Sequence, residues 1–575
     1  MRVTNQPVEL IIETTTAPQA KSKSRSSGND LRKTLMDAGI PVDDITTSKN
    51  AVLPIQAKAK RGLAPADGKV YVKTAIRDFE MNPWDVAHQS ARALGTTTTF
   101  AEPDLMQEFV VDNNVDVPFK KTRNAKTGGA KAGENSYDPD WQPHKNTIWH
   151  LGDGFSQLKS AREAVWDMDV TIRIGHLDTG YGKDHPAIPE AIKLNPLQRN
   201  FIVGEDVKDA HDRFTNGMLR MPGHGTGTLG ILAGGKVRLQ TDDGVFNDYL
   251  GGAPFAEVVC CRVAPSVVLM KTSAFAEAIN YLTTLTLSGT PVHVVSMSMG
   301  GAPAKAWADA VNAAYEAGIV IVTAAGNNFN GLPTQHVIYP ARFQRVIAAC
   351  GVTHDYAPYT HKKLGEMQGC YGPRRHMAKA LAGFTPNTPW ATTNNGKISF
   401  AGAGTSSATP QVASAAAIYY RKYYNELSAL EPWQRVEAIR NALYKTALKK
   451  VQRFDGTYAD CFGNGIVQAF DALSVPVGRP ARMTPPDKVP LFPILTTIFK
   501  AGPQVQPGKR QEMFNTELAQ LVFNHPELAA IIDNDKTPYE KVSQKKWNQF
   551  AEAVIEHPAA SITLKKHLMQ THAVR

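Results

Sequence analysis

The sequence predicts an α/β protein, with a parallel β-sheet flanked by helices, a small α+β unit before it and a helical extension after it. Three observations predict this fold class. Short β-branched, apolar runs alternate with helical stretches between residues 146 and 473, which is typical of a parallel sheet with helices on both faces. A strand, a helix and a strand follow one another before residue 120. Apolar residues recur at helical spacing after residue 511.

The N-terminal region divides into three parts. Residues 1–65 are rich in Thr, Ser, Lys and Ala without regular periodicity, and we expect a mobile segment there. Residues 66–119 form the α+β unit, and residues 120–145 read as an exposed, Gly- and Lys-rich linker. The elements predicted for the unit are a strand, a helix capped by Asn82 with proline at its first position, and a second strand, over residues 69–74, 83–94 and 100–105.

The central region, residues 146–473, is predicted to form the parallel sheet and its covering helices. Buried strands are predicted over residues 170–177, 258–263, 292–297 and 319–324. Helices are predicted over residues 225–234, 302–317 and 409–425. Residues 474–510 contain many prolines and predict a linker, and residues 511–575 form the helical extension.

Composition narrows the class of protein. At 575 residues, with 42% hydrophobic and 20% charged residues, the chain is expected to form two or three globular units. Its net charge of +10 is spread over separate short basic runs, which favours a solvated surface over a nucleic-acid-binding patch. The five cysteines match neither a disulfide framework nor a metal site, and fit a reducing compartment. We see no signal peptide or membrane span and expect a cytoplasmic protein.

Three short segments carry the chemistry: Asp178-Thr179-Gly180, His224-Gly225-Thr226 and Gly404-Thr405-Ser406. They supply an acid, a base and a hydroxyl in the chain order that subtilisin, a standard example of this triad, also has. Ser406 would attack a peptide carbonyl, His224 would carry the proton, and Asp178 would orient and stabilise the imidazole. Pro410 is favoured near a helix start, which would place Ser406 at a helix N-terminus.

Two further segments complete a peptidase site. Asn327, after a predicted strand, can donate its amide to an oxyanion alongside the backbone N–H of Ser406. Ser298-Met299-Gly300 also follows a strand, and an exposed edge there could pair with an extended substrate.

Residues 146–473 resemble the subtilisin-like serine peptidases, or subtilases, and are therefore the predicted catalytic domain. The resemblance implies that Asp178, His224 and Ser406 form the catalytic triad and that Asn327 is the oxyanion donor. It also implies a polypeptide substrate and a substrate-binding region. That region consists of Ser298, Met299, Gly300, Gly326 and Ile338. An apolar residue at position 338, near the base of the pocket for the residue before the cleaved bond, favours a broad or apolar preference.

The chain departs from the family pattern at Gly227 and Gln411, where histidines are usual, and at Ser407, where methionine is usual. Long spacings between the triad residues imply loop insertions over residues 235–249 and 353–395. The N-terminal unit resembles subtilase pro-domains through Glu102-Pro103-Asp104. An intramolecular inhibitor and a noninhibitory extension both stay open for this unit, as do a partner-binding module and simple packing for the C-terminal helices.

Several features of the sequence have a second interpretation. We expect no required cofactor and no catalytic metal. A calcium ion that stabilises the loop is the alternative to a solvated acidic turn at Asp242, Asp243, Asn247 and Asp248. We expect four further histidines to be surface or core residues, namely His176, His293, His336 and His354. The alternative to a serine endopeptidase is a catalytically silent scaffold with the same fold. A serine–carboxyl peptidase is disfavoured because it would place Glu at position 224.

Overall fold

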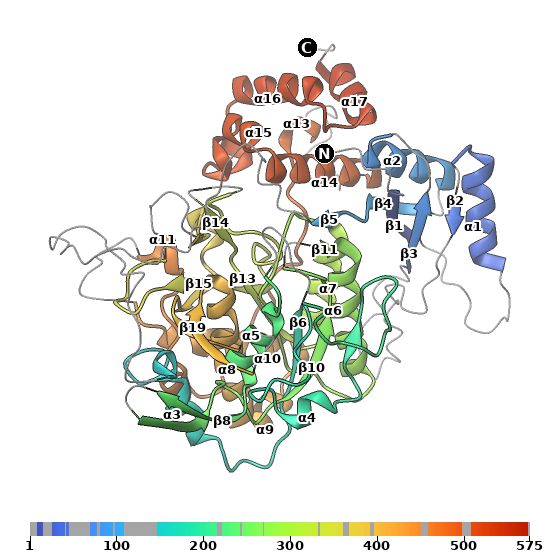
Figure 1. Ribbon diagram of the computed structural model, residues 1–575. Coiled ribbons are helices and arrows are strands. Elements are labelled where there is room, and N and C mark those ends of the chain that lie inside the picture. Colours follow the sequence, from blue (N-terminus) through green and yellow to red (C-terminus); the bar gives the residue numbers. More distant parts are fainter. Residues whose placement is uncertain are drawn as a thin grey trace, which may run out of the picture.

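The computed structural model of the protein is drawn in Figure 1. It describes residues 8–14, 26–40, 42–44, 70–76, 81–95, 98–107, 147–214, 221–241, 244–267, 269–329, 331, 334–359, 367–391, 396–449, 458–496 and 508–572.

Seven parallel strands form the central sheet of the described residues, which confirms the predicted fold class. Their spatial order is β17 (Ala380–Phe384), β15 (Val346–Val352), β13 (Val320–Ala324), β12 (Val294–Met297), β6 (Arg173–Asp178), β10 (Glu257–Arg262) and β7 (Arg199–Asn200). Successive side chains of a strand point to opposite faces. In β10, Val258 and Cys260 therefore enter one core, and Val259 and Cys261 enter the other.

Helices cover both faces of this sheet. On one face lie α5 (His224–Ala233) and α8 (Thr405–Lys422). On the other lie α6 (Thr272–Leu287) and α7 (Lys305–Glu316). The remaining elements of this domain are α3 (Leu158–Ala164), α4 (Glu190–Lys193), β8 (Lys236–Thr241), β9 (Gly244–Tyr249), β11 (Met270–Lys271), β14 (Asn327–Phe329), β16 (Met367–Gly369), β18 (Thr388–Ala391), β19 (Ile398–Gly402), α9 (Tyr424–Ser428), α10 (Pro432–Thr446), α11 (Tyr458–Phe462), α12 (Ala469–Ala472), and the 3-10 turns η2 (Trp149–Leu151) and η3 (Arg374–His376).

The N-terminal unit is a four-stranded antiparallel sheet with two helices. Its strand order is β2 (Val42–Asp44), β3 (Val70–Ile76), β1 (Val8–Thr14) and β4 (Thr98–Pro103), and its helices are α1 (Ser26–Asp37) and α2 (Pro83–Leu94). As predicted, the Asn82 side chain accepts the Trp84 N–H at the start of α2.

The prediction of a mobile segment over residues 1–65, with the α+β unit starting at residue 66, differs from the structure, because β1, α1 and β2 lie in this range and belong to the unit. The difference is largest at strand β1. This strand lies inside the sheet, between β3 and β4, and its Leu10 and Ile12 side chains are fully buried. The seven residues of β1 lie in an otherwise polar stretch of the sequence. They become part of a core only because β1 pairs with two strands that are distant in the chain.

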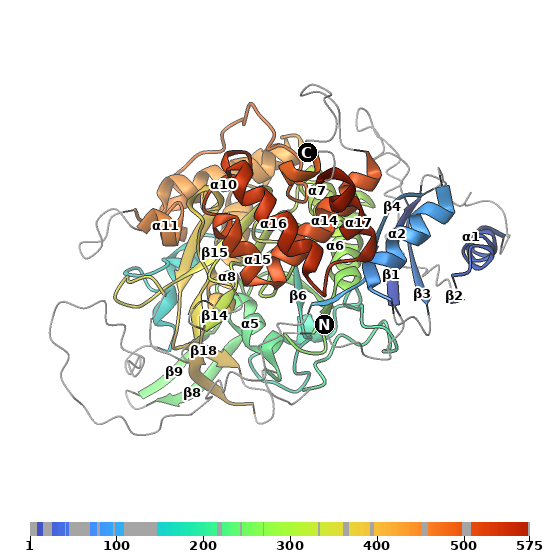
Figure 2. The ribbon, with the colours of Figure 1, turned by 90° about the horizontal axis from the view of Figure 1, so that it is seen from above.

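The C-terminal residues form a helical bundle with its own apolar core. We call α13–α17 the C-terminal bundle; its elements are α13 (Pro493–Thr496), α14 (Lys509–Asn524), α15 (Pro526–Ile531), η4 (Asp533–Asp535), η5 (Tyr539–Lys541), α16 (Gln544–Glu556) and α17 (Ile562–His572). Figures 1 and 2 both show α14 beside α2 of the N-terminal unit, on one end of the molecule.

The predicted linker 474–510 also differs from expectation, because part of it is bound to the catalytic domain. The buried carboxylate of Asp487 accepts the backbone N–H groups of Gln344 and Arg345 at 2.6 and 3.0 Å. In the described part of the chain, no helix is both long enough and apolar enough to cross a membrane.

Candidate active site

Asp178 is the last residue of β6, at the carboxyl edge of the sheet where catalytic groups gather in such folds. Its side chain is fully buried. Oδ1 accepts from His224 Nδ1 at 2.7 Å and from the Thr179 N–H at 2.7 Å, and Oδ2 accepts from Thr228 Oγ1 at 2.9 Å. Burial opposes ionisation, but the charge and hydrogen bond of His224, with the Thr179 N–H, bring the pKa of Asp178 below its usual value.

His224 is the first residue of α5 and joins the other two predicted triad residues. Its Nε2 lies 3.0 Å from Ser406 Oγ, and its Nδ1 faces Asp178. Because an ionised carboxylate only accepts, Nδ1 carries the proton and Nε2 is left to accept from the serine. The glycine at position 225 permits this approach, since a Cβ there would be 2.0 Å from the Gly180 carbonyl oxygen.

Ser406 is the second residue of α8, which begins four residues earlier than the predicted start at residue 409. The first N–H groups of a helix have no acceptor within it, so the Ser406 N–H can meet an oxyanion. Pro410 lies inside α8 and cannot donate to the Ser406 carbonyl. Ser298 Oγ donates to that carbonyl instead, at 3.1 Å. Ser298, predicted for the substrate strand, therefore supports the helix turn that carries Ser406.

Asn327 lies beside this helix start, at the first position of β14. Its Oδ1 accepts the Thr405 N–H at 2.9 Å and is 3.2 Å from Thr405 Oγ1. Because a backbone N–H only donates, the amide oxygen must face Thr405, which leaves Nδ2 as a donor. Gly404 keeps space next to that donor, since a Cβ at position 404 would be 2.9 Å from Asn327 Nδ2.

The predicted substrate-binding residues also lie together. Ser298, Met299 and Gly300 follow β12, and Gly326 follows β13, its neighbour in the sheet. The Ile338 side chain is buried and fills the space between the two glycines. A Cβ at Gly300 would be 2.7 Å from Ile338 Cδ1, and a Cβ at Gly326 would be 3.0 Å from three of its carbons.

Sequence reasoning missed two residues that support Asp178. Thr228 Oγ1 hydrogen-bonds Asp178 Oδ2, and His176 Nε2 lies 2.9 Å from the same hydroxyl. Burial lowers the pKa of His176 to about 4, so the ring is neutral at pH 7 and Nε2 can donate to Thr228. His176 is buried, as expected, but it also belongs to the hydrogen-bond chain. The available signal was spacing: His176 is two strand residues before Asp178, and Thr228 is one helical turn after His224.

A third missed residue is Trp390 in β18, on one of the predicted insertions. Its ring lies edge-on to the His224 imidazole, with centroids 5.6 Å apart at 64°. A Cβ at Gly227 would be 1.9 Å from Trp390 Cε2, so the glycine at this unusual position makes room for the tryptophan. The glycine at position 227 and the tryptophan brought in by the insertion thus compensate each other in space. Position 411 is another departure from the family pattern. Here Gln411 Oε1 accepts the Phe384 N–H, and Gln411 Nε2 donates to the Phe384 carbonyl.

Of the four candidate calcium ligands, the structure describes two. Asp242 and Asp243 lie outside the described residues, and Asn247 is in β9. The carboxylate of Asp248 already contacts two cations, Arg162 at 3.4 Å and Lys159 at 3.5 Å. This pairing competes with coordination of an ion by Asp248.

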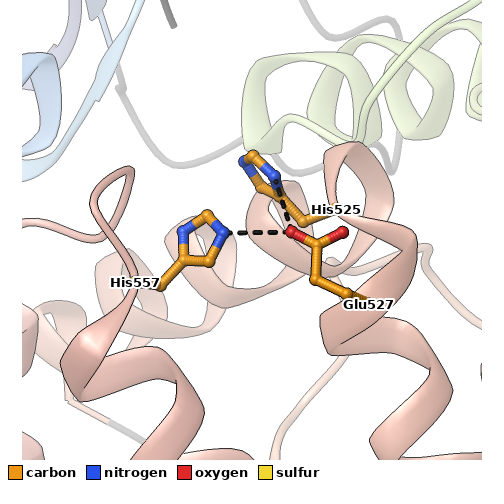
Figure 3. Close-up of side chains that lie close together, drawn as sticks. All are labelled: His525, Glu527 and His557. Carbon is orange, nitrogen blue, oxygen red and sulfur yellow. Dashed lines mark hydrogen bonds and ion pairs between the residues drawn. The ribbon is translucent and has the colours of Figure 1, made fainter. Parts of the chain in front are cut away.

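One cluster of possible metal ligands occurs among the described residues, in the C-terminal bundle: His525, Glu527 and His557 (Figure 3). Glu527 Oε1 is 3.2 Å from His557 Nε2 and 3.4 Å from His525 Nδ1. His557 Nδ1 accepts the Ala559 N–H at 3.2 Å, so in the neutral ring the proton is on Nε2 and is donated to Glu527. An ion would need the Nε2 lone pair, and the hydrogen bonds account for this cluster without one.

Comparison with known proteins identifies the family to which this chain belongs. The model of the subtilase family matches residues 169–465, about half of the chain. The chain is 28% identical to subtilisin DY from Bacillus licheniformis over 281 residues, which are 48% of this chain and 84% of that protein. It is 27% identical to subtilisin Savinase from Lederbergia lenta over 248 residues, 43% of this chain and 76% of that protein. A thermostable alkaline protease from Halalkalibacterium halodurans is 29% identical over 251 residues, 43% of this chain and 56% of that protein.

A parallel sheet with an acid, an imidazole and a serine hydroxyl at its carboxyl edge is an arrangement typical of serine hydrolases. This chain belongs to the subtilase family, whose model spans all three residues. Membership of a peptidase family implies a polypeptide substrate.

Proposed function

We propose that this protein is a serine endopeptidase that hydrolyses peptide bonds through an acyl-enzyme. The observation that carries the proposal is the continuous hydrogen-bond chain from Asp178 through His224 to Ser406, with steps of 2.7 and 3.0 Å. All three side chains are at least nine-tenths buried, and this strengthens their electrostatic interactions.

The reaction follows from these positions. Ser406 Oγ attacks the scissile carbonyl while His224 Nε2 takes its proton, and Asp178 stabilises the imidazolium that forms. The oxyanion of the tetrahedral intermediate accepts from Asn327 Nδ2 and from the Ser406 N–H. His224 then gives its proton to the leaving amine, and the acyl-enzyme remains. A water molecule, deprotonated by His224, hydrolyses that ester and restores the serine.

For substrate choice, we propose a broad or apolar preference at the residue before the cleaved bond. Ile338 is apolar and fills the space between Gly300 and Gly326, so it offers no charge to a basic side chain. Mapping the cleavage sites in an unfolded protein mixture tests the preference. Selective cleavage after lysine or arginine would contradict it.

A fluorophosphonate probe tests the activated nucleophile. Wild-type protein should be labelled at Ser406, and the Ser406→Ala variant should not. Labelling is measured in the intact chain and in a chain that has been cut between residues 120 and 145 and then freed of its N-terminal unit. Absence of labelling in both forms of folded wild-type protein would contradict the endopeptidase proposal and favour a silent scaffold.

We further propose that the N-terminal unit is an intramolecular inhibitor. Strand β5 (Met106–Gln107) pairs antiparallel with β11, and Gln107 Oε1 accepts the Ala302 N–H at 2.8 Å. Residue 302 follows the predicted substrate strand closely, so the chain leaving β5 starts next to that strand. This position supports the inhibitor proposal, because it places the end of the described unit beside the predicted substrate-binding residues. Stronger fluorophosphonate labelling after removal of the unit is the expected result.

Acidic side chains attach this unit to the catalytic domain. Glu102 accepts the first N–H groups of α7, from Lys305 at 3.0 Å and Ala306 at 2.8 Å. Asp104 accepts the Ser273 N–H of α6 at 2.8 Å and the Ser273 hydroxyl at 2.6 Å. Both carboxylates act as helix caps supplied by another domain, where the helix dipole favours negative charge.

Retention of the unit should depend on pH through Glu102. Burial raises the pKa of Glu102 to about 7, against the lowering effect of its N–H donors and Lys305. The bound state therefore favours the protonated carboxyl. Its contribution to retention is present below about pH 4.5, the ordinary value, and is lost as the pH rises through 7. We expect the cut unit to dissociate faster at pH 8 than at pH 5.5, and Glu102→Gln to reduce this difference. Equal rates at both pH values would contradict the prediction.

Thr228 is expected to position Asp178. Thr228→Val keeps the side-chain shape but removes the donor to Asp178 Oδ2, a hydrogen bond to a charged group. We expect kcat to fall roughly tenfold to a hundredfold with little change in KM. Thr228→Ser should restore most of kcat. Equal losses in the valine and serine variants would indicate a packing role instead.

A further inference from the structure

The C-terminal bundle contacts the N-terminal unit and the catalytic domain at the same place. Its helices α14 and α17 lie against α2, as Figures 1 and 2 show. Met513 of α14 is buried in the apolar core of the N-terminal unit. Most of the other contacts are polar and buried, and they pair specific side chains.

Asp85 of α2 supplies a cap to a helix of the bundle. Its carboxylate accepts the Ile562 and Thr563 N–H groups, each at 2.8 Å, and the Thr563 hydroxyl at 2.6 Å. These are the first residues of α17. Three carboxylates of the N-terminal unit thus each cap a helix of another part of the chain. Asp104 caps α6, Glu102 caps α7, and Asp85 caps α17. Two of these helices belong to the catalytic domain and the third to the bundle.

Gln520 of α14 bridges the two partners of the bundle. Its Oε1 accepts from Trp84 Nε1 at 2.9 Å, and its Nε2 donates to the Pro303 carbonyl at 3.0 Å. Trp84 belongs to the N-terminal unit and Pro303 to the catalytic domain. The side chains of Trp84 and Gln520 are at most 5% exposed, so loss of either partner leaves a buried polar group unpaired.

Two charged contacts extend this interface. His88 Nε2 of α2 lies 3.1 Å from Glu517 Oε2 of α14, and Glu517 also accepts the N–H and hydroxyl of Ser561. Glu13 of β1 is fully buried between Lys305 of α7, at 2.8 Å, and Lys509 of α14, at 3.8 Å. Both acidic residues are therefore enclosed by more than one part of the chain.

We propose that the C-terminal bundle is a clamp that keeps the N-terminal unit on the catalytic domain after the connection between them is cut. None of the contacts described above involves residues 108–146, so cutting that connection removes none of them. Removal or displacement of the bundle should therefore speed the release of the cut unit. That retention would also maintain inhibition is a consequence that rests on the proposed function, whereas the clamp itself does not.

The test uses the full chain with Ser406→Ala to prevent self-digestion, and with a recognition sequence for an unrelated protease inserted in residues 120–145. The protein is immobilised through its C-terminus and cut, and release of the N-terminal fragment is followed with time. Asp85→Ala removes the cap on α17. Gln520→Met removes both hydrogen bonds of the bridge at similar volume. Arg92→Ala changes an exposed residue on the same helix α2 and serves as the matched control.

We expect slow release of the fragment, at equal rates, from the cut parent protein and from Arg92→Ala. Asp85→Ala and Gln520→Met should each release it roughly tenfold faster. Thermal unfolding of each uncut variant shows whether that variant has folded. If one has not folded, the release rate of the other tests the clamp. Release from both folded variants at the parent rate would overturn the clamp. The inhibitor proposal fails separately, if wild-type enzyme freed of the fragment is no more active than the intact chain.

Discussion

Replacing Ser406 with alanine is expected to lower kcat by about 10⁶-fold, the size that removal of the triad serine has in subtilisin. The reason is that Ser406 Oγ is the only hydroxyl hydrogen-bonded to His224 Nε2 among the described contacts. Without it, no covalent intermediate can form. The measurement is hydrolysis of a peptide substrate by protein from which the N-terminal unit has been removed.

Ser407→Ala is the matched control for this replacement. Ser407 is also a buried serine of the first turn of α8, but its hydroxyl donates to the Ala403 carbonyl at 3.3 Å. Its loss should leave kcat within about tenfold of wild type, because a single neutral hydrogen bond contributes little. Retention of even one-thousandth of the wild-type kcat by Ser406→Ala would show that another group is the nucleophile.

Asp178→Asn is expected to reduce kcat by about 10⁴-fold, as the equivalent change does in other serine proteases. The asparagine oxygen can still accept from Thr179 and His224, so the side chain keeps its place. What is lost is the negative charge opposite the imidazolium, in a site where the carboxylate is fully buried. A low local dielectric makes that charge far more effective than it would be in water.

Asp212→Asn provides the comparison for this variant. Asp212 is a second buried carboxylate nearby, which accepts from Thr179 Oγ1 at 2.6 Å and makes no contact with His224 among the described hydrogen bonds. We expect it to lose less than about tenfold in kcat. Similar losses of kcat in Asp178→Asn and Asp212→Asn would show that the effect comes from negative charge in this region and not from Asp178 in particular. The thermal midpoint of each variant, measured alongside, separates lost chemistry from lost folding.

The sequence predicted the central fold because its signals are local. Short β-branched runs alternate with helical stretches, and the strands and helices expected between residues 146 and 473 are present, with shifts of a few residues at their ends. The predicted residues Asp178, His224, Ser406 and Asn327 converge because each follows a strand or starts a helix at the carboxyl edge of one sheet. Spacing along the chain was sufficient for both conclusions.

What the sequence alone determined, then, is the α/β fold and the choice of Asp178, His224 and Ser406 as the side chains that meet, since both depend on residue types in a fixed local order. Only the tertiary structure decided which side chains support them. The hydroxyl of Thr228 and the ring of Trp390 reach the site from α5 and β18, and no local pattern records that approach. Strand β1 and the cap of Asp85 on α17 likewise join residues that are far apart in the chain. Such pairs form because buried polar groups and strand edges must find partners, and which partner is near is set by packing.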